Sequence, residues 1–163
     1  MTSLTILKAD HRKVEELFKK ILKPNTSFEN QRKLFDELKE SLTLHAKTEE
    51  KFLYPQMEKT KEAHDLTLEA YEEHNMVKIL LKEIPLVSEK DVWEAKVVVL
   101  QEQVKHHVEE EEEELFPIVE KKFSPKELTL LGEEIQAWRE KGLKETASDI
   151  VSNVVEKLGL SKE

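Results

Sequence analysis

A pattern of histidine, glutamate, aromatic residue and proline occurs twice in this chain and restricts its fold more than any other feature. One copy runs from His45 to Pro55 and the other from His107 to Pro117, and the two align without a gap. In each copy glutamates follow the histidine at positions four and five, and an aromatic residue and a proline follow at positions nine and ten. Residues four apart share one face of an α-helix, about 6 Å apart along its axis. That spacing suits two side chains that bind the same metal site.

Each copy is preceded by one more histidine, His11 in the first half and His74 in the second. His11 lies 34 residues before His45, and His74 lies 33 residues before His107. An acidic residue stands directly before each of the two earlier histidines. The same residue types at nearly the same spacing in both halves indicate an internal duplication of a helix pair.

Six consecutive glutamates, Glu109 to Glu114, overlap the second copy. On a helix they sweep about 600° of arc at 3.6 residues per turn, and the apolar residues on both sides of the run predict that one face of this helix is buried. A like-charged run by itself is typical of a solvated surface. Because an unpaired buried carboxylate costs several kcal/mol, an inward glutamate in this repeat indicates a nearby cation.

The composition predicts one helical domain and excludes several kinds of site. The 163 residues include only three glycines and five prolines, and 37% of them are charged, which is typical of helices with short connections. The absence of cysteine excludes disulfides, iron–sulfur clusters and thiol nucleophiles. A net charge of −9 argues against nucleic acid and anionic membranes as partners. With no apolar segment typical of a signal peptide or a membrane span, we expect a cytoplasmic protein.

Apolar periodicity predicts an all-α fold. The four long helices are expected over residues 3–22, 28–53, 61–83 and 88–115, with Pro55 and Pro117 ending or kinking the second and fourth. They predict an antiparallel up-down-up-down four-helix bundle over residues 1–123. A C-terminal helical extension, residues 124–163, is expected on or near this bundle. It begins with a capping serine, Ser124, stops at Gly142, and resumes as a weakly amphipathic segment that ends at Gly159.

Inward residues at similar heights on the four helices converge in such a bundle. The candidate metal ligands are one histidine from each helix and two glutamates, one turn further along the second and fourth helices: His11, His45, Glu49, His74, His107 and Glu111. This set suits two ions about 3.5 Å apart, each held by two imidazoles and both bridged by the carboxylates. Imidazole and carboxylate ligands without sulfur favour iron or manganese over structural zinc, although zinc also binds these groups.

Four other side chains are not predicted to bind metal. Asp10 and Glu73 are interpreted as surface charges, because each points sideways on its helix from the adjacent histidine. Tyr54 lies half a turn round from His45 and is interpreted as a packing residue at the end of the bundle. His64 stands outside the repeat and is expected to be exposed.

The paired His-x-x-x-Glu motifs that end in Tyr-Pro and Phe-Pro, together with the isolated histidines upstream, resemble the hemerythrin-like, HHE cation-binding domains. The resemblance covers about residues 1–142. It implies a four-helix bundle with an oxo- or hydroxo-bridged non-haem di-iron centre (Fe2+/Fe3+). It also implies the ligands His11, His45, Glu49, His74, His107 and Glu111.

The chain departs from the oxygen-carrying hemerythrins at two positions. Where those proteins have a further histidine on the third helix, this chain has Lys78. Where they have an aspartate five residues after the fourth-helix histidine, this chain uses Glu111, four residues after His107. Counting five residues back from Glu111 makes His106 an alternative ligand. With one histidine fewer, we expect an open or water-filled position on one or both ions.

These observations predict an iron protein that binds or reacts with dioxygen, peroxide or nitric oxide, in sensing, storage or oxidative-stress defence. An enzyme with catalase- or peroxidase-like activity on the same site is the alternative. A ferritin-like site is disfavoured because Leu42 and Val104 stand where its Glu-x-x-His motif needs glutamates. A metal-free interaction module and a single-zinc protein are the weaker alternatives. The sequence does not indicate the oligomeric state or the role of residues 143–163.

Overall fold

Hydroxyl side chains cap the first two long helices. The computed structural model describes residues 1–157 and, of these, the side chains of residues 1–142. Helix α1 (Ser3–Ile21) begins after Thr2, whose hydroxyl accepts a hydrogen bond from the backbone N–H of Thr5. Helix α2 (Phe28–Phe52) begins after Ser27 in the same way. The chain that the structure describes contains helices and connections but no strand, and the predicted all-α class is confirmed.

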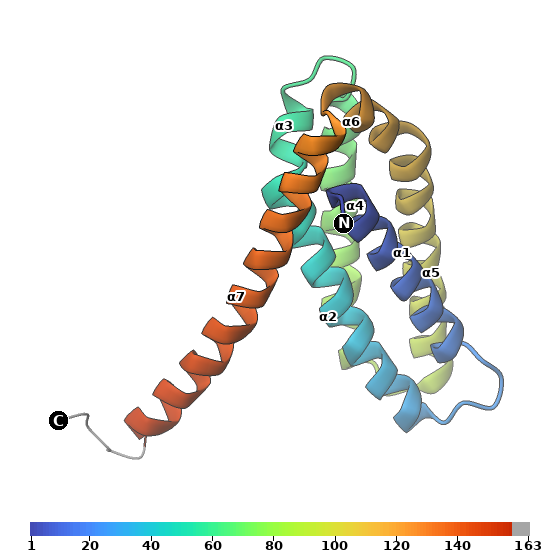
Figure 1. Ribbon diagram of the computed structural model, residues 1–163. Coiled ribbons are helices and arrows are strands. Elements are labelled where there is room, and N and C mark those ends of the chain that lie inside the picture. Colours follow the sequence, from blue (N-terminus) through green and yellow to red (C-terminus); the bar gives the residue numbers. More distant parts are fainter. Residues whose placement is uncertain (158–163) are drawn as a thin grey trace.

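The other elements follow the predicted order with small differences at their ends. They are α3 (Tyr54–Glu58), α4 (His64–Glu83), the short 3₁₀ helix η1 (Ile84–Leu86), α5 (Lys90–Glu110), the π-helical turn η2 (Glu111–Leu115), α6 (Phe116–Lys122) and α7 (Pro125–Lys157). Figure 1 shows α1, α2, α4 and α5 as the long helices of one group, with the first part of α7 beside it and the C-terminal part of α7 projecting away from it.

The two prolines of the repeat interrupt their helices differently. Helix α2 stops at Phe52, as Pro55 predicts, and the short helix α3 starts two residues later. Before Pro117, the helical path instead widens into the π-helical turn η2. Such turns are frequent at functional sites, and this one begins at Glu111, one of the candidate ligands.

The apolar core is divided into two clusters. One is built around Trp93, Phe18 and Phe35, and the other around Phe116, Leu53 and Met57. On α1 and α4 the candidate histidine stands between residues of the first cluster and residues of the second, whereas on α2 and α5 the second cluster begins beyond the helix end. The candidate ligands therefore form a polar layer between two apolar clusters, and all six are buried.

Helix α7 continues where the sequence predicts a stop. It starts with the predicted capping box, in which Ser124 N–H donates to Glu127 Oε2 (2.7 Å) and Glu127 N–H donates to Ser124 Oγ (3.2 Å). The prediction that Gly142 ends it is wrong, since the helix extends to Lys157. One interior glycine destabilises a helix by only about 1 kcal/mol, so the surrounding helix-forming residues keep α7 helical at Gly142. The predicted end at Gly159 lies outside the described residues.

Helix α7 also approaches the start of the chain closely at Gly132. A Cβ atom at this position would lie 2.2 Å from the carbonyl oxygen of Met1. Any larger side chain would therefore force the two segments apart. None of the helices within residues 1–157 is long and apolar enough to cross a bilayer.

Candidate metal centre

Four buried imidazoles meet in the polar layer, in two pairs. The Nε2 atoms of His11 and His45 are 3.1 Å apart, and these residues are called the first histidine pair. The Nε2 atoms of His74 and His107 are 3.2 Å apart, and these are called the second histidine pair. Each of the four side chains is at most 7% exposed. The helices α1, α2, α4 and α5 thus each direct one ring nitrogen to the same small volume.

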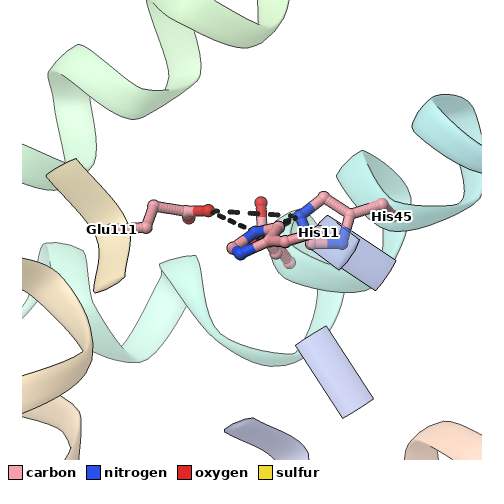
Figure 2. Close-up of side chains that lie close together, drawn as sticks. His11, His45 and Glu111 are labelled. Carbon is pink, nitrogen blue, oxygen red and sulfur yellow. Dashed lines mark hydrogen bonds and ion pairs between the residues drawn. The ribbon is translucent and has the colours of Figure 1, made fainter. Parts of the chain in front are cut away.

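Two buried glutamates connect the pairs. Glu49 directs Oε1 to Nε2 of His45 (2.9 Å) and Oε2 to Nε2 of His74 (3.0 Å), so its two oxygens face different pairs. Glu111 places its Oε1 3.3 Å from His11 Nε2 and 3.2 Å from His107 Nε2. Figure 2 shows the Glu111 carboxylate approaching the rings of the first histidine pair. All six residues predicted as ligands are therefore brought together.

Tyr54 lies inside this cluster, and its interpretation as a packing residue at the bundle end is wrong. Its hydroxyl oxygen is 2.7 Å from Glu111 Oε2 and 2.9 Å from Glu49 Oε2, so its single proton can be donated to either carboxylate. Nε2 of His74 is 3.1 Å away. The helical angle counted from His45 does not apply, because the chain bends between Phe52, where α2 ends, and Tyr54, where α3 begins.

Asp10 and Glu73 are outer partners of the histidines, and their interpretation as surface charges is wrong. Asp10 Oδ2 is 2.9 Å from Nδ1 of His45, and Glu73 Oε1 is 3.1 Å from Nδ1 of His107. Each projects sideways from its own helix, as expected, but the neighbouring helix presents a histidine there. The signal was present in the sequence, because the acid before the histidine is itself repeated in the two halves.

The remaining imidazoles face carboxylates at a longer distance. Nδ1 of His11 is 3.7 Å from Glu112 Oε1, and Nδ1 of His74 is 3.7 Å from Glu50 Oε1. Every ring therefore has an acidic group on its outer nitrogen. Carboxylates in this position orient a ligating imidazole and raise its basicity.

Basic side chains stand behind all four outer carboxylates. They are Arg139 behind Asp10, Arg12 behind Glu112, Lys78 behind Glu50 and His106 behind Glu73. Lys78, at the position where the oxygen-carrying hemerythrins have a further histidine, is 47% exposed and pairs with Glu50. His106 is 64% exposed, so of the two adjacent histidines it is His107 that faces the site. His64 is exposed, as expected.

The buried imidazoles and carboxylates shift one another's pKa values strongly. Burial would lower the pKa of His45, but the charge of Glu49 and hydrogen bonds with Asp10 and both glutamates raise it well above its usual value. The pKa of His107 is raised in the same way, chiefly by Glu111. Burial would raise the pKa of Glu49, but the charge of His45 and hydrogen bonds from three histidines hold it well below its usual range. The neighbouring carboxylates therefore favour a positive charge on His45 and on His107.

Several of these polar atoms lack hydrogen bonds despite full burial. Nδ1 of His11 and Nδ1 of His74 have none, whereas Oε1 of Glu49 and Oε1 of Glu111 lie 2.9 Å and 3.2 Å from imidazole nitrogens of His45 and His107. Buried polar groups in proteins are normally satisfied. The side chains converge into two groups whose ligand atoms all lie within 4.8 Å of one another: His11, His45, Glu49 and Glu111, and separately Glu49, His74 and His107. Nitrogen and oxygen donors in two groups that share a carboxylate fit a pair of metal ions.

Helix α7 supports one half of this site through Arg139. The guanidinium lies 2.7 Å from Asp10 Oδ2 and 2.8 Å from Thr48 Oγ1, and Asp10 in turn holds His45. We expect Arg139→Leu to weaken one of two metal-binding steps by about 10-fold, the lower end of the range for outer partners. A competitive titration with a chelator measures this. Arg32→Leu removes an arginine that donates to the Val87 carbonyl away from the site, and it should leave both steps unchanged. Equal affinities in wild type and Arg139→Leu would contradict the prediction.

Comparison with known proteins agrees with this geometry. The family model described as Hemerythrin HHE cation binding domain matches residues 2–119. A crystal structure of a hemerythrin HHE cation binding domain-containing protein from Mycobacterium kansasii, described as an Rv2633c homolog, superposes with a TM-score of 0.75. It is 28% identical, and the match covers 86% of each chain.

One curated relative carries a different kind of name. A protein of Nostoc sp. (strain PCC 7120 / SAG 25.82 / UTEX 2576) named DNA nickase is 30% identical over 137 residues. The match covers 83% of this chain and 38% of the relative, so this chain spans well under half of that protein's length.

Proposed function

Because this chain belongs to the hemerythrin HHE cation-binding domain family, we propose that its buried cluster binds two iron ions. The observation that carries the proposal is the sharing of Glu49 between two groups of potential ligands, one around each histidine pair. The proposed ligands are His11, His45, Glu49, His74, His107 and Glu111. Donors without sulfur favour iron or manganese over structural zinc.

The proposed function is to bind or react with dioxygen, peroxide or nitric oxide, in sensing, storage or oxidative-stress defence. When bound, a pair of iron ions supplies redox chemistry and sites for small oxygen or nitrogen ligands. The chain itself excludes bulk water through the two apolar clusters and orients the imidazoles through the outer carboxylates. Tyr54 holds a proton 2.7 Å from Glu111 Oε2, and burial beside two carboxylates raises its pKa well above the usual value.

We also propose that residues 1–123 form an antiparallel up-down-up-down bundle that arose by duplication, with residues 124–163 as an extension. Matched contacts in the two halves support this. Asp10 of α1 holds a histidine of α2, and Glu73 of α4 holds a histidine of α5. Glu50 and Glu112, which follow Glu49 and Glu111, face the other two histidines.

No nickase activity is proposed for this chain. This chain spans only 38% of that protein, and its own net charge of −9 opposes binding to a polyanion. An enzyme that disproportionates or reduces peroxide remains the second candidate, because Tyr54 holds its proton between the carboxylates of the two proposed iron sites.

The test is to expose the iron-loaded full chain separately to dioxygen, hydrogen peroxide and nitric oxide, and to follow its optical spectrum. We expect at least one of the three to change the spectrum in wild type. Sustained peroxide consumption over many turnovers would identify an enzyme, and reversal on removal of dioxygen would identify a carrier or sensor. A two-iron protein that responds to none of the three would contradict the proposed function.

A further inference from the structure

A cavity of about 250 Å³ opens onto the candidate metal centre from the side of the first apolar cluster. Its inner end is formed by all four histidines of the cluster. Glu49, Glu111 and Tyr54 do not line it, and Glu50 is the carboxylate that does. A molecule in this cavity therefore meets the imidazole edges without displacing Glu49 or Glu111.

The walls of the cavity are apolar. Val14, Leu42, Leu81, Val104 and Val108 line it, and they come from four different helices. All five are buried residues of the first apolar cluster. With imidazoles at the inner end and the other polar groups confined to the exposed mouth, a cavity with such walls selects a ligand with an apolar body and one polar end.

The outer end of the cavity lies between α2 and α4. Thr43 and Lys47 of α2 are exposed and Lys78 of α4 is 47% exposed, so the lining reaches the molecular surface. Lys78 Nζ is 3.1 Å from Glu50 Oε1 across this opening. An ion pair this exposed contributes at most about 1 kcal/mol. It therefore opens readily and does not seal the cavity.

The size of the cavity favours a larger organic ligand over a diatomic molecule. An engineered apolar cavity of about 150 Å³ is large enough to bind benzene. A volume of about 250 Å³ would leave a diatomic molecule with most of its surroundings empty, at the cost of lost contacts. By the same measure it accommodates an apolar molecule of about ten non-hydrogen atoms.

We propose that this cavity binds the organic part of a substrate, and that the substrate class is an alkyl or aryl hydroperoxide. The inference rests on the proposed function, because it is the peroxide end that would meet the metal centre. The apolar walls hold the hydrocarbon body, and the four histidines mark the end at which the polar oxygens lie. Hydrogen peroxide and dioxygen reach the centre by the same opening but do not fill the cavity.

Binding is tested with 2-phenyl-2-propanol, a stable alcohol with the carbon skeleton of an aryl hydroperoxide. The full chain is titrated with it by calorimetry, both without metal and after metal loading. D-xylose, which has a similar number of non-hydrogen atoms but is polar throughout, is the ligand control. We expect saturable binding of the alcohol in both forms and no binding of xylose. Binding to the metal-free chain keeps this test independent of iron chemistry.

Substitutions that fill the cavity locate the binding site. Val77→Phe and Ala46→Leu add volume to opposite walls, on α4 and α2, and each should weaken alcohol binding by at least 10-fold. Val99→Phe is the matched control, because Val99 is 46% exposed and does not line the cavity. Circular dichroism checks that each variant folds. Two independent wall positions are used, so that the test still applies if one variant does not fold.

The outcomes separate this inference from the proposed function. Absence of saturable alcohol binding, or binding that neither wall variant weakens, would overturn the inference even if two irons load and react with hydrogen peroxide. Alcohol binding that both wall variants weaken supports it. If the alcohol binds but the iron-loaded chain reacts with no organic hydroperoxide, the substrate assignment is wrong, and the proposed function fails only if dioxygen, hydrogen peroxide and nitric oxide also give no response.

Discussion

Replacement of Glu111 by alanine is expected to reduce the metal content of the chain from two ions to one or none. Glu111 is the ligand whose Oε1 lies close to both histidine pairs, 3.3 Å from His11 Nε2 and 3.2 Å from His107 Nε2. Loss of a partner that only orients a ligand already weakens metal binding by about 10- to 100-fold. Removal of a ligand shared by both ions should exceed that range. Elemental analysis after loading with ferrous iron measures the effect.

The glutamate run itself supplies the control. Glu113 stands two residues from Glu111 in the same π-helical turn but is exposed. Glu113→Ala makes the same chemical change and alters the net charge by the same amount. It should retain two ions. Two ions retained in Glu111→Ala would show that the ligand assignment is wrong, and loss of metal in both variants would point to a general effect of charge.

Metal loading is expected to raise the melting temperature of the chain by about 8–16 °C. A ligand that binds only the folded state stabilises it by about 4 kcal/mol at 1,000 times its dissociation constant. For a chain of this size each kcal/mol shifts the midpoint by about 2–4 °C.

Differential scanning calorimetry with and without metal, at fixed pH and protein concentration, measures this shift. His74→Ala provides the control, because it removes one ligand of the second histidine pair and should show a smaller rise. A chain that melts at the same temperature with and without metal would indicate that the buried cluster is satisfied by its own protons and hydrogen bonds. The same shift in His74→Ala would indicate metal binding elsewhere on this acidic surface.

The repeat allowed the principal side chains of the centre to be predicted from sequence. A helix places residues four apart on one face, so His45 with Glu49 and His107 with Glu111 had to point the same way. The upstream histidines joined them because their offset is nearly the same in both halves. The choice of His107 over His106 followed from the repeat as well, and the structure places His107 inside and His106 at the surface.

The side chains that were misjudged depend on geometry between elements. Tyr54 reaches the centre because the chain bends after α2, and counting residues along one helix cannot describe a bend. Asp10 contacts a histidine of the next helix, which requires the lateral spacing of α1 and α2. Arg139 joins the network from α7, 129 residues away along the chain. Gly142 does not end α7, because the cost of one interior glycine is small beside that of breaking a long helix.

The arrangement also assigns different surroundings to the two histidine pairs. Besides their contacts with the buried histidines, Asp10 in the first half is paired with an arginine, whereas Glu73 in the second half has His106 3.7 Å away, with Glu110 nearby. The phenol of Tyr54 comes from the first copy of the repeat, and the second copy has Phe116, whose ring stacks on His11. The surroundings of the two histidine pairs are therefore not identical, and if two ions bind as proposed we expect them to bind with different affinities.

The most direct test of this account is the iron content of the full chain after anaerobic loading with ferrous iron and removal of excess metal. The shared position of Glu49 between the two groups of ligands predicts two irons per chain. One iron per chain, or none, would contradict the paired centre, whatever reactivity the protein then showed toward oxygen or peroxide.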